Sequence, residues 1–443
     1  MLTKLDKAIF TFRTYWRAWN ATRHQYSPEK IDLIRNRKLK NVLNFSYHNV
    51  KYYRELFEQT NLSLNQINTV DDIVKLPVTT KHDLRGRYWE FLPQVLPECR
   101  VSRTSGSTGV PVCILSDKNS RLNNSAATIR SRRAMGLPFI GHPILTLLKR
   151  ETDPILKPPH WTYLQGIHKT HYINPYIDSE ESRTYANRVL RQLKQPAVIA
   201  ITPAIRVFAE KIKSGFFNSI KPCCVSSGGE SLTKQNRVLM ETVFGTIVTD
   251  NYACNEAGEV AWQCHQAKGY HINTDNVVLE ILKNGEPVGP GETGEVVITN
   301  LNRYAMPILR YANGDLARLS KEVCPCGCKL PMLAEIIGRS GQDMCFPNGK
   351  TVPWNVLKSA MNHNQIRQFQ IVQNPNASVT IKYIPESQAG ISELEALFSQ
   401  RFKCLLPSST QITFEIVSHI PQASSGKSKL VICNYREHGN LCV

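Results

Sequence analysis

Residues 179–249 alternate between segments with helical spacing and short apolar segments. The second apolar segment ends in a polar turn that contains Gly228 and Gly229, and it is followed directly by another helical pattern. Alternation of strands and helices at this spacing is typical of a sheet covered by helices, so it predicts an α/β fold. The expected helices are residues 179–193, 204–212 and 233–243, and the expected strands lie at 197–201, 225–230 and 247–249.

The pattern changes after residue 277, where short apolar runs are separated by turns rich in Gly, Pro and Asn. The runs at 277–282, 294–300 and 307–311 predict a small antiparallel β unit. Beyond residue 338 the chain again mixes patterns, with strands expected near 368–372, 378–383 and 411–417 and a helix near 392–402. We therefore expect two domains, residues 1–338 and residues 339–443.

The amino-terminal region is predicted to be helical, at residues 28–60 and again at 119–135. Residues 8–19 combine aromatic side chains such as Trp16 with arginines such as Arg13. A helix of this kind either lies on a membrane surface or docks its apolar face on its own domain, and the second arrangement is the more common. No apolar run is long enough to cross a bilayer, and no signal peptide is recognisable, so we expect a cytoplasmic protein.

The chain has 443 residues and a formal net charge of +18. Its lysines and arginines are scattered along the sequence rather than gathered in one run. This distribution predicts a general attraction for anionic ligands and gives no ground for a nucleic-acid-binding site.

Thr104 begins the most chemically suggestive stretch, which is built almost entirely from hydroxyl-bearing residues and glycines and precedes an apolar run. Glycines let the backbone turn tightly, and hydroxyls beside exposed N–H groups can bind an anion. The alternative is a surface turn, and the stretch lacks the lysine of a Walker A motif. The candidate phosphate-binding residues are Thr104, Ser105, Gly106, Ser107, Thr108 and Gly109.

Further motifs follow this stretch in a fixed order. They are Gly229-Glu230, Tyr252-Ala253-Cys254-Asn255-Glu256, Arg310-Tyr311-Ala312-Asn313-Gly314-Asp315, Gly338-Arg339-Ser340-Gly341-Gln342-Asp343 and Ser424-Ser425-Gly426-Lys427. From about residue 40 onward the chain resembles the adenylate-forming superfamily, and within it the phenylacetate–CoA ligase branch with its CapK-like members of capsular-polysaccharide gene clusters. The resemblance implies a large α/β amino-terminal domain of mixed sheets and a small, mobile α+β carboxyl-terminal lid.

The resemblance also implies an activity. A carboxylic acid reacts with ATP to give an acyl-adenylate and pyrophosphate, and the acyl group then passes to an acceptor, most commonly coenzyme A. The alternatives are transfer to a non-CoA acceptor as an amide or ester, and a degenerate member that only binds ligands. The small acid itself is not readable from the sequence, although residues 160–176 and 226–229 are candidates for its pocket.

Residue roles follow from the matching motifs. The resemblance places Glu256 on Mg²⁺, Asp315 on the ribose hydroxyls, and Lys427 on the α-phosphate and the substrate carboxylate. It puts a hinge for the second half-reaction at Arg339 and Asp343. The remaining nucleotide-binding candidates are Gly229, Glu230, Asn251, Tyr252 and Arg339.

Two positions depart from the family pattern. Val110 stands where lysine is usual at the end of the phosphate-binding stretch, and Ala253 stands where glycine is common after the tyrosine. The first departure removes a positive charge near the phosphates, and the two together motivate the alternative of a protein that binds ligands without catalysis.

Thirteen cysteines are many for a chain without a disulfide framework. Cys264, His271, Cys324 and Cys326 match a Cys–His–Cys-x-Cys pattern of the same branch, and four Cys and His ligands are typical of structural zinc. The alternative is a set of free thiols. Small carboxylic acids, ATP and CoA are the other expected partners, and the protein is expected to be a monomer or a homodimer.

Overall fold

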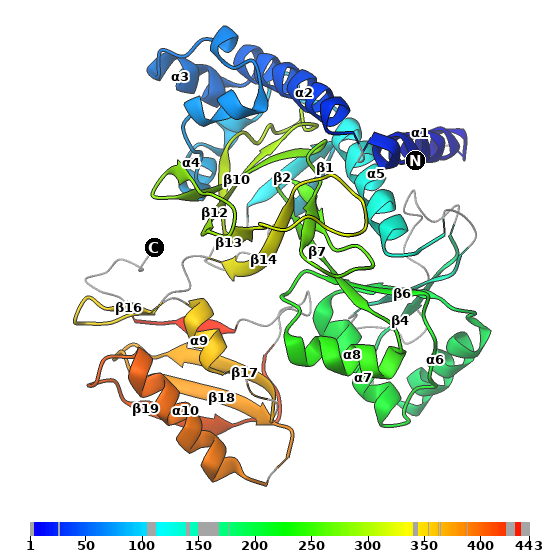
Figure 1. The fold of residues 1–443 in the computed structure, drawn as a ribbon, viewed down its shortest axis with the longest axis vertical. Coiled ribbons are helices and arrows are strands. Elements are labelled where there is room, and N and C mark those ends of the chain that lie inside the picture. Colours follow the sequence, from blue (N-terminus) through cyan, green and yellow to red (C-terminus); the bar gives the residue numbers. More distant parts are fainter. Residues whose placement is uncertain are drawn as a thin grey trace. The chain divides into compact units, whose positions relative to one another are not determined.

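The computed structural model describes residues 4–24, 27–103, 112–138, 142–148, 168–176, 178–339, 344–352, 354–361, 363, 365–387, 389–421 and 430–435. The chain forms two compact units (Figure 1). The first unit comprises Met1–Asn313 and Ala317–Ile336, and the second comprises Gly314–Leu316 and Ile337–Val443. The expected roles of an AMP-binding domain over residues 1–338 and a lid over residues 339–443 stay predictions.

The helices of the first unit include those expected between residues 179 and 243. Ser179 and Thr233 cap two of them, because each hydroxyl accepts a hydrogen bond from the backbone N–H three residues on. The helices are α1 (Lys4–His24), α2 (Pro28–Asn49), α3 (Lys51–Gln59), α4 (Lys81–Gly86), α5 (Lys118–Ala134), α6 (Glu180–Gln192), α7 (Thr202–Lys213) and α8 (Lys234–Phe244). Within the described residues, none of them combines the length and apolar composition that crossing a bilayer requires.

A twelve-stranded sheet in the order β11-β10-β12-β13-β14-β9-β8-β7-β6-β5-β3-β4 organises the first unit. The strands from β4 to β7 pair in parallel, whereas the pairs β7–β8, β8–β9 and β9–β14 are antiparallel. The first five in chain order are β3 (Ile144–Leu147), β4 (Thr170–Ile173), β5 (Ala197–Ala200), β6 (Cys224–Gly228) and β7 (Val248–Cys254). The others are β8 (Gly258–Trp262), β9 (Tyr270–Ile272), β10 (Val277–Lys283), β11 (Glu286–Pro287), β12 (Thr293–Asn300), β13 (Tyr311–Leu319) and β14 (Met332–Arg339).

Helices α6, α7 and α8 pack on the parallel strands, as Figure 1 shows at the green part of the ribbon. Their shared core contains Phe208, Phe244 and Val225, all essentially without solvent exposure. The expected α/β architecture is confirmed by this arrangement. The strands expected at 277–282 and 294–300 do form, and they continue the large sheet through β13, β14 and β9.

The expected strand at 307–311 is wrong except for its last residue, because β13 begins only at Tyr311. Arg310 has a φ of +48°, and this left-handed conformation interrupts an extended strand. Its buried guanidinium pairs with Glu280 at 2.8 Å and donates to the carbonyls of Val74 and Leu76 at 2.8 and 2.6 Å. Arg310 therefore ties the start of β13 to the segment that precedes α4.

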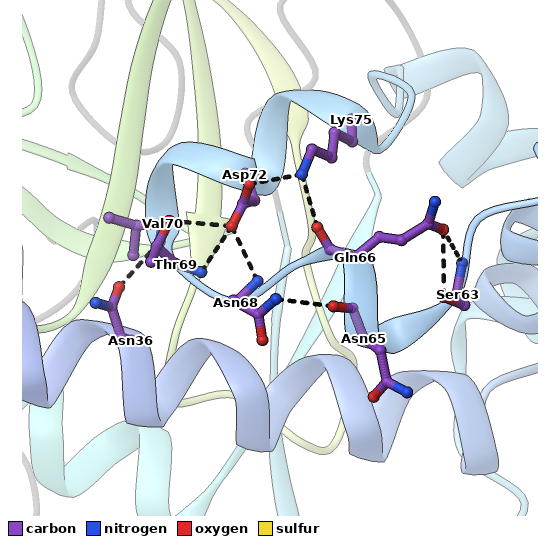
Figure 2. Close-up of polar contacts among 9 residues, drawn as sticks. All are labelled: Asn36, Ser63, Asn65, Gln66, Asn68, Thr69, Val70, Asp72 and Lys75. Atoms are coloured by element: carbon purple, nitrogen blue, oxygen red, sulfur yellow. Dashed lines mark hydrogen bonds and ion pairs between the residues drawn. The ribbon is translucent and has the colours of Figure 1, made fainter.

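That preceding segment is held together by its own polar side chains (Figure 2). The Asp72 carboxylate accepts hydrogen bonds from the backbone N–H groups of Asn68 and Thr69, each at 3.0 Å, and from Lys75 at 2.6 Å. Asn36 of α2 accepts from the Val70 N–H at 2.9 Å, which fixes the segment to that helix. The backbone of residues 76–79 is thus anchored at both ends, since the Thr79 N–H also donates to the Arg310 carbonyl at 2.8 Å.

A separate two-stranded hairpin pairs β1 (Cys99–Arg103) with β2 (Cys113–Asp117). The register places Arg103 opposite Cys113, so the two flanks of the Thr104 stretch lie side by side.

The second unit has a four-stranded sheet in the order β19-β18-β17-β20, with a small hairpin and two helices. Its core includes Trp354, Ile371 and Phe398. The elements are β15 (Met344–Cys345), β16 (Thr351–Val352), α9 (Trp354–Ala360), β17 (Ile366–Gln373), β18 (Val379–Pro385), α10 (Ile391–Leu405), β19 (Ile412–Ile416) and β20 (Val431–Cys433). The strands and the helix expected between residues 368 and 417 are confirmed.

Candidate active site

The carboxyl ends of β6 and β7 bring four of the predicted nucleotide-binding residues together. Gly228 lies opposite Asn251 in the parallel register, so Gly229 and Glu230 leave the sheet beside Asn251 and Tyr252. Gly229 has a φ of +77°, which a glycine adopts without strain. Ligands of open α/β sheets bind at this end of the strands.

Asn251 presents an acceptor that no other described group uses. Its amide nitrogen donates to the Ser226 hydroxyl at 2.8 Å, while its buried Oδ1 has no hydrogen-bond partner in the described structure. Buried polar atoms are normally paired, so an orphaned acceptor at the end of a strand is typical of a ligand contact.

Asp250, the preceding residue, lies in a closed polar network. It accepts hydrogen bonds from Ser227 at 2.9 Å and from Tyr270 at 2.8 Å. Burial raises the pKa of the Asp250 carboxyl to about 6, because the low-dielectric surroundings disfavour its charged form. The network stiffens the strand that carries Asn251 and Tyr252.

Tyr252 is buried, and its hydroxyl lies 2.7 Å from the side-chain nitrogen of Asn313, which donates to it. The contact joins the end of β7 to the start of β13. Asp315, the predicted ribose ligand, is the fifth residue of β13 and is also buried. A register shift between Tyr252 and Ala253 marks a bulge, a feature that often redirects side chains beside active sites.

Glu256 lies on the turn between β7 and β8 and is half-buried. The turn is held by Asn300, whose amide donates to the Glu256 carbonyl at 3.3 Å. The Asn255 side chain donates to the carbonyl of Arg103 at 3.1 Å. Because Arg103 is the last residue of β1, this bond sets the flank of the Thr104 stretch against the turn that carries Glu256.

Arg303 is a residue of this site that the sequence did not reveal. It is buried and donates to the carbonyls of Leu115 at 3.1 Å and Asn255 at 2.9 Å, while its Nε has no partner in the described structure. Burial lowers the pKa of the Arg303 guanidinium, and Glu256 is among the groups that act in the opposite direction. No sequence pattern marks Arg303 as a site residue, since arginines are usually exposed.

A polar cavity of about 180 Å³ opens beside this turn. Its walls include Arg303, Asn255 and Cys254 from the Glu256 side, Ser102 from the hairpin and Arg121 from α5. Two arginines among hydroxyl and amide groups suit an anionic ligand better than an apolar one.

The predicted metal ligands Cys264, His271, Cys324 and Cys326 come together in the first unit. Their ligand atoms all lie within 4.8 Å of one another. The Cys264 and Cys324 sulfurs are 3.5 Å apart, and the Cys326 sulfur is 3.4 Å from His271 Nε2. Three thiols and one imidazole at this spacing fit the tetrahedral donor set that zinc prefers.

The remaining predicted residues are not placed by the structure. Thr104–Gly109, Asp343 and Lys427 lie outside the described residues, as does the side chain of Arg339 at the end of β14. Their roles stay predictions.

Comparison with known proteins supports the same family as the motifs. Residues 344–434 match the family described as the CapK C-terminal domain. The sequence is 28% identical over 339 residues to phenylacetate-coenzyme A ligase of Thermus thermophilus, covering 73% of each chain. It is 24% identical over 430 residues to Protein CapK of Staphylococcus aureus, covering 94% of this chain and 93% of that protein.

The fold is similar to the crystal structure of 2-hydroxyisobutyryl-CoA ligase in the postadenylation state. The TM-score is 0.72 over 92% of this chain and 90% of that chain, at 18% sequence identity. At this identity the likeness establishes the fold.

Proposed function

The chain belongs to the phenylacetate–CoA ligase and CapK-like branch of the adenylate-forming superfamily, and from this membership we propose that it is an AMP-forming acid–CoA ligase. In the first half-reaction a carboxylate oxygen attacks the α-phosphorus of ATP and pyrophosphate leaves. In the second, the thiol of CoA loses its proton and attacks the acyl carbon, and AMP leaves.

The observation that carries this proposal is the convergence of motif residues at one end of the sheet. Tyr252 and the unused Asn251 acceptor lie at the end of β7, and the turn that follows carries Glu256 beside buried Arg303. The flank of the Thr104 stretch is bonded to the same turn. Motifs separated by about 150 residues in sequence thus share one location.

The adenosine half of ATP is assigned to the strand ends. Tyr252 lies against the adenine ring, and the free Oδ1 of Asn251 suits the exocyclic amine of adenine. Gly229 and Glu230 border the same position, and Asp315 accepts both ribose hydroxyls. The support for these roles is the burial of Tyr252 and Asp315 and the orphaned acceptor on Asn251.

The triphosphate is assigned to the Thr104–Gly109 stretch and to Lys427. The half-buried Glu256 carboxylate is a suitable ligand for Mg²⁺, which when bound neutralises charge on the phosphate oxygens. Arg303 keeps the Glu256 turn in place and adds positive charge nearby, so it offsets the lysine that Val110 replaces. A charged array fixed before the reaction stabilises the transition state without reorganisation.

The second half-reaction is assigned to rotation of the carboxyl-terminal unit about Arg339 and Asp343. This motion removes Lys427 from the acyl group and admits CoA, which is a common use of a hinge between domains. The further proposal that the acyl unit is destined for a polysaccharide rests on the resemblance to CapK-like members of capsular-polysaccharide gene clusters, and 94% of the chain aligns with Protein CapK. Because ATP and CoA are its co-substrates, we place the protein in the cytoplasm.

The test separates the two half-reactions. Pyrophosphate release is measured over a panel of aryl, hydroxy and amino acids with CoA, and the active acid is then used with Lys427→Ala and with Lys429→Ala as its neighbouring control. We expect Lys427→Ala to slow adenylation about 100-fold or more while still converting a synthetic acyl-adenylate and CoA into thioester. The control should retain both steps.

Two outcomes would contradict the proposal. Pyrophosphate release that is unchanged in Lys427→Ala would remove the role of that lysine. Adenylate that accumulates with CoA but is consumed by an amine or alcohol would replace CoA by another acceptor.

We also propose that Cys264, His271, Cys324 and Cys326 hold one structural zinc ion. The support is the donor set and the close approach of its ligand atoms. When bound, zinc would stabilise the fold, and no step of the reaction is assigned to it.

A further inference from the structure

Helix α1 packs against α5 mainly through small side chains. Ala18 and Thr14 are buried, and Ala18 lies in a cluster with Ala126 and Ile129 of α5. Arg17 adds a hydrogen bond to Asn119 at 3.3 Å. Figure 1 shows α1 alongside α5 at the edge of the first unit.

The opposite face of α1 carries four large apolar side chains that are exposed. Ile9 is 47% exposed, Phe12 72%, Trp16 61% and Trp19 54%. Their spacing of three, four and three residues places all four on one stripe of the helix. The expectation that the apolar face of this helix docks on its own domain therefore holds for Tyr15 but is wrong for this stripe.

Such a stripe of exposed apolar side chains is unusual on the surface of a monomeric soluble protein. Single exposed apolar residues are common, but a contiguous row with two tryptophans marks an interaction surface. It is separate from the candidate active site, whose residues lie at the ends of β6 and β7.

The positive charge around the stripe favours an anionic partner. Lys4–His24 contains five lysines and arginines and one aspartate, and Arg13 borders the stripe and is exposed. The whole chain has a formal net charge of +18. Two copies of so basic a chain repel each other, whereas an anionic bilayer attracts both the helix and the rest of the molecule.

We propose that the Ile9, Phe12, Trp16 and Trp19 stripe binds an anionic lipid bilayer, with α1 lying in the plane of the membrane surface. Tryptophan prefers the depth of the headgroups, and an in-plane amphipathic helix buries only one face in the lipid. The small face of α1 stays on α5, so the domain is held at the surface without any spanning segment. This role does not depend on the ligase chemistry.

The test uses the full chain with phosphatidylcholine vesicles, with and without phosphatidylglycerol. The variant Phe12→Ser/Trp16→Ser/Trp19→Ser removes the stripe, and Trp89→Ser is the matched control, because Trp89 is 80% exposed elsewhere on the first unit. Circular dichroism and thermal unfolding establish that both variants are folded. We expect wild type and Trp89→Ser to sediment with the anionic vesicles, and the triple variant to bind them at least about tenfold more weakly.

Tryptophan fluorescence provides an independent readout. Wild type and Trp89→Ser should shift to shorter wavelength with anionic vesicles, and high salt should reduce the binding. Wild type that stays in the supernatant, or that binds neutral and anionic vesicles equally, would overturn the proposal. A wild-type dimer that the triple variant converts into a monomer would show that a second copy covers the stripe instead.

Discussion

Arg303 shows how a single buried charge can organise a site. Its two carbonyl contacts, to Leu115 and Asn255, join the hairpin that flanks the Thr104 stretch to the turn that carries Glu256. The sequence predicted Glu256 from its motif, but burial of Arg303 arises from packing between segments nearly 190 residues apart, which no local pattern reveals.

Replacing Arg303 should therefore disturb the position of Glu256. Arg303→Lys keeps the charge but cannot reach both carbonyls, and we expect about 10- to 100-fold weaker binding of ATP in the presence of Mg²⁺. Isothermal titration calorimetry with and without Mg²⁺ measures the change in affinity for ATP. Arg318→Lys, at an exposed ion pair with Glu335, is the control. Equal weakening with and without Mg²⁺ would argue against positioning of Glu256.

Asp250 makes the stability of the protein depend on pH in a predictable direction. Its folded pKa of about 6 lies above the value of 3.8 expected in the unfolded chain, so the folded state binds the proton more tightly. Stability from this group is present below pH 4 and is lost as the pH rises through 6.

Asp250→Asn removes that dependence. The variant should be less stable than wild type near pH 4, and the difference should shrink by an amount on the order of 2–3 kcal/mol by pH 7. Chemical unfolding at several pH values measures the difference. A gap that widens as the pH rises would contradict the raised pKa.

At the scale of elements, the bounds of helices were predicted best where helix caps and apolar spacing agree. Ser179 and Thr233 each begin a helix within one residue of the expected position, because their hydroxyls bond to the first turn. Prediction failed at residues 307–310, where Pro, Ile and Leu suggest a strand. There the left-handed Arg310 and its ion pair with Glu280 determine the backbone, and both depend on the tertiary fold.

The backbone geometry at the end of β14 requires a glycine. Gly338 has a φ of +121°, and a Cβ there would lie 1.9 Å from the ring of Trp354 on α9. The residue immediately precedes the predicted hinge at Arg339.

We expect Gly338→Ala to destabilise the carboxyl-terminal unit by about 2–4 kcal/mol, because strain and overpacking act together. Gly349→Ala separates the two effects, since Gly349 also has a positive φ of +76° but open space around it. Hydrogen exchange of β17 and β18 reports on the unit directly. Equal protection in the two variants would show that contact with Trp354 is unimportant.

At the scale of the whole molecule, one short strand joins the two parts of the large sheet. The parallel strands and the long antiparallel strands are connected through β9, which has three residues and pairs with β14 only at Tyr270 and His271. Of the four proposed zinc ligands, His271 lies on β9 itself, and the ligand atoms of Cys264, Cys324 and Cys326 are within 4.8 Å of its own. The sequence predicted the ligand set but not its place in the sheet, because strand order is set by long-range pairing.

Loss of the metal should therefore weaken the first unit. Cys326→Ser should release zinc and lower the free energy of unfolding by more than about 3 kcal/mol, as loss of a structural metal does. Metal analysis after EDTA washing and calorimetry measure both effects. Cys404→Ser, at an exposed cysteine, is the control. Wild-type protein that contains no zinc after purification with zinc present would contradict the assignment.

The short pairing of β9 with β14 also affects how the sheet forms while the chain is being synthesised. The parallel strands and β8 leave the ribosome first, and β9 can pair with β8 at once. The other edge of β9 cannot pair with β14 until Leu333 has been synthesised some 60 residues later. During that interval a nascent sheet has an open edge, which invites pairing with the wrong strand. The free edge of β9 is therefore the place in the nascent first unit where we expect wrong strand pairing to begin.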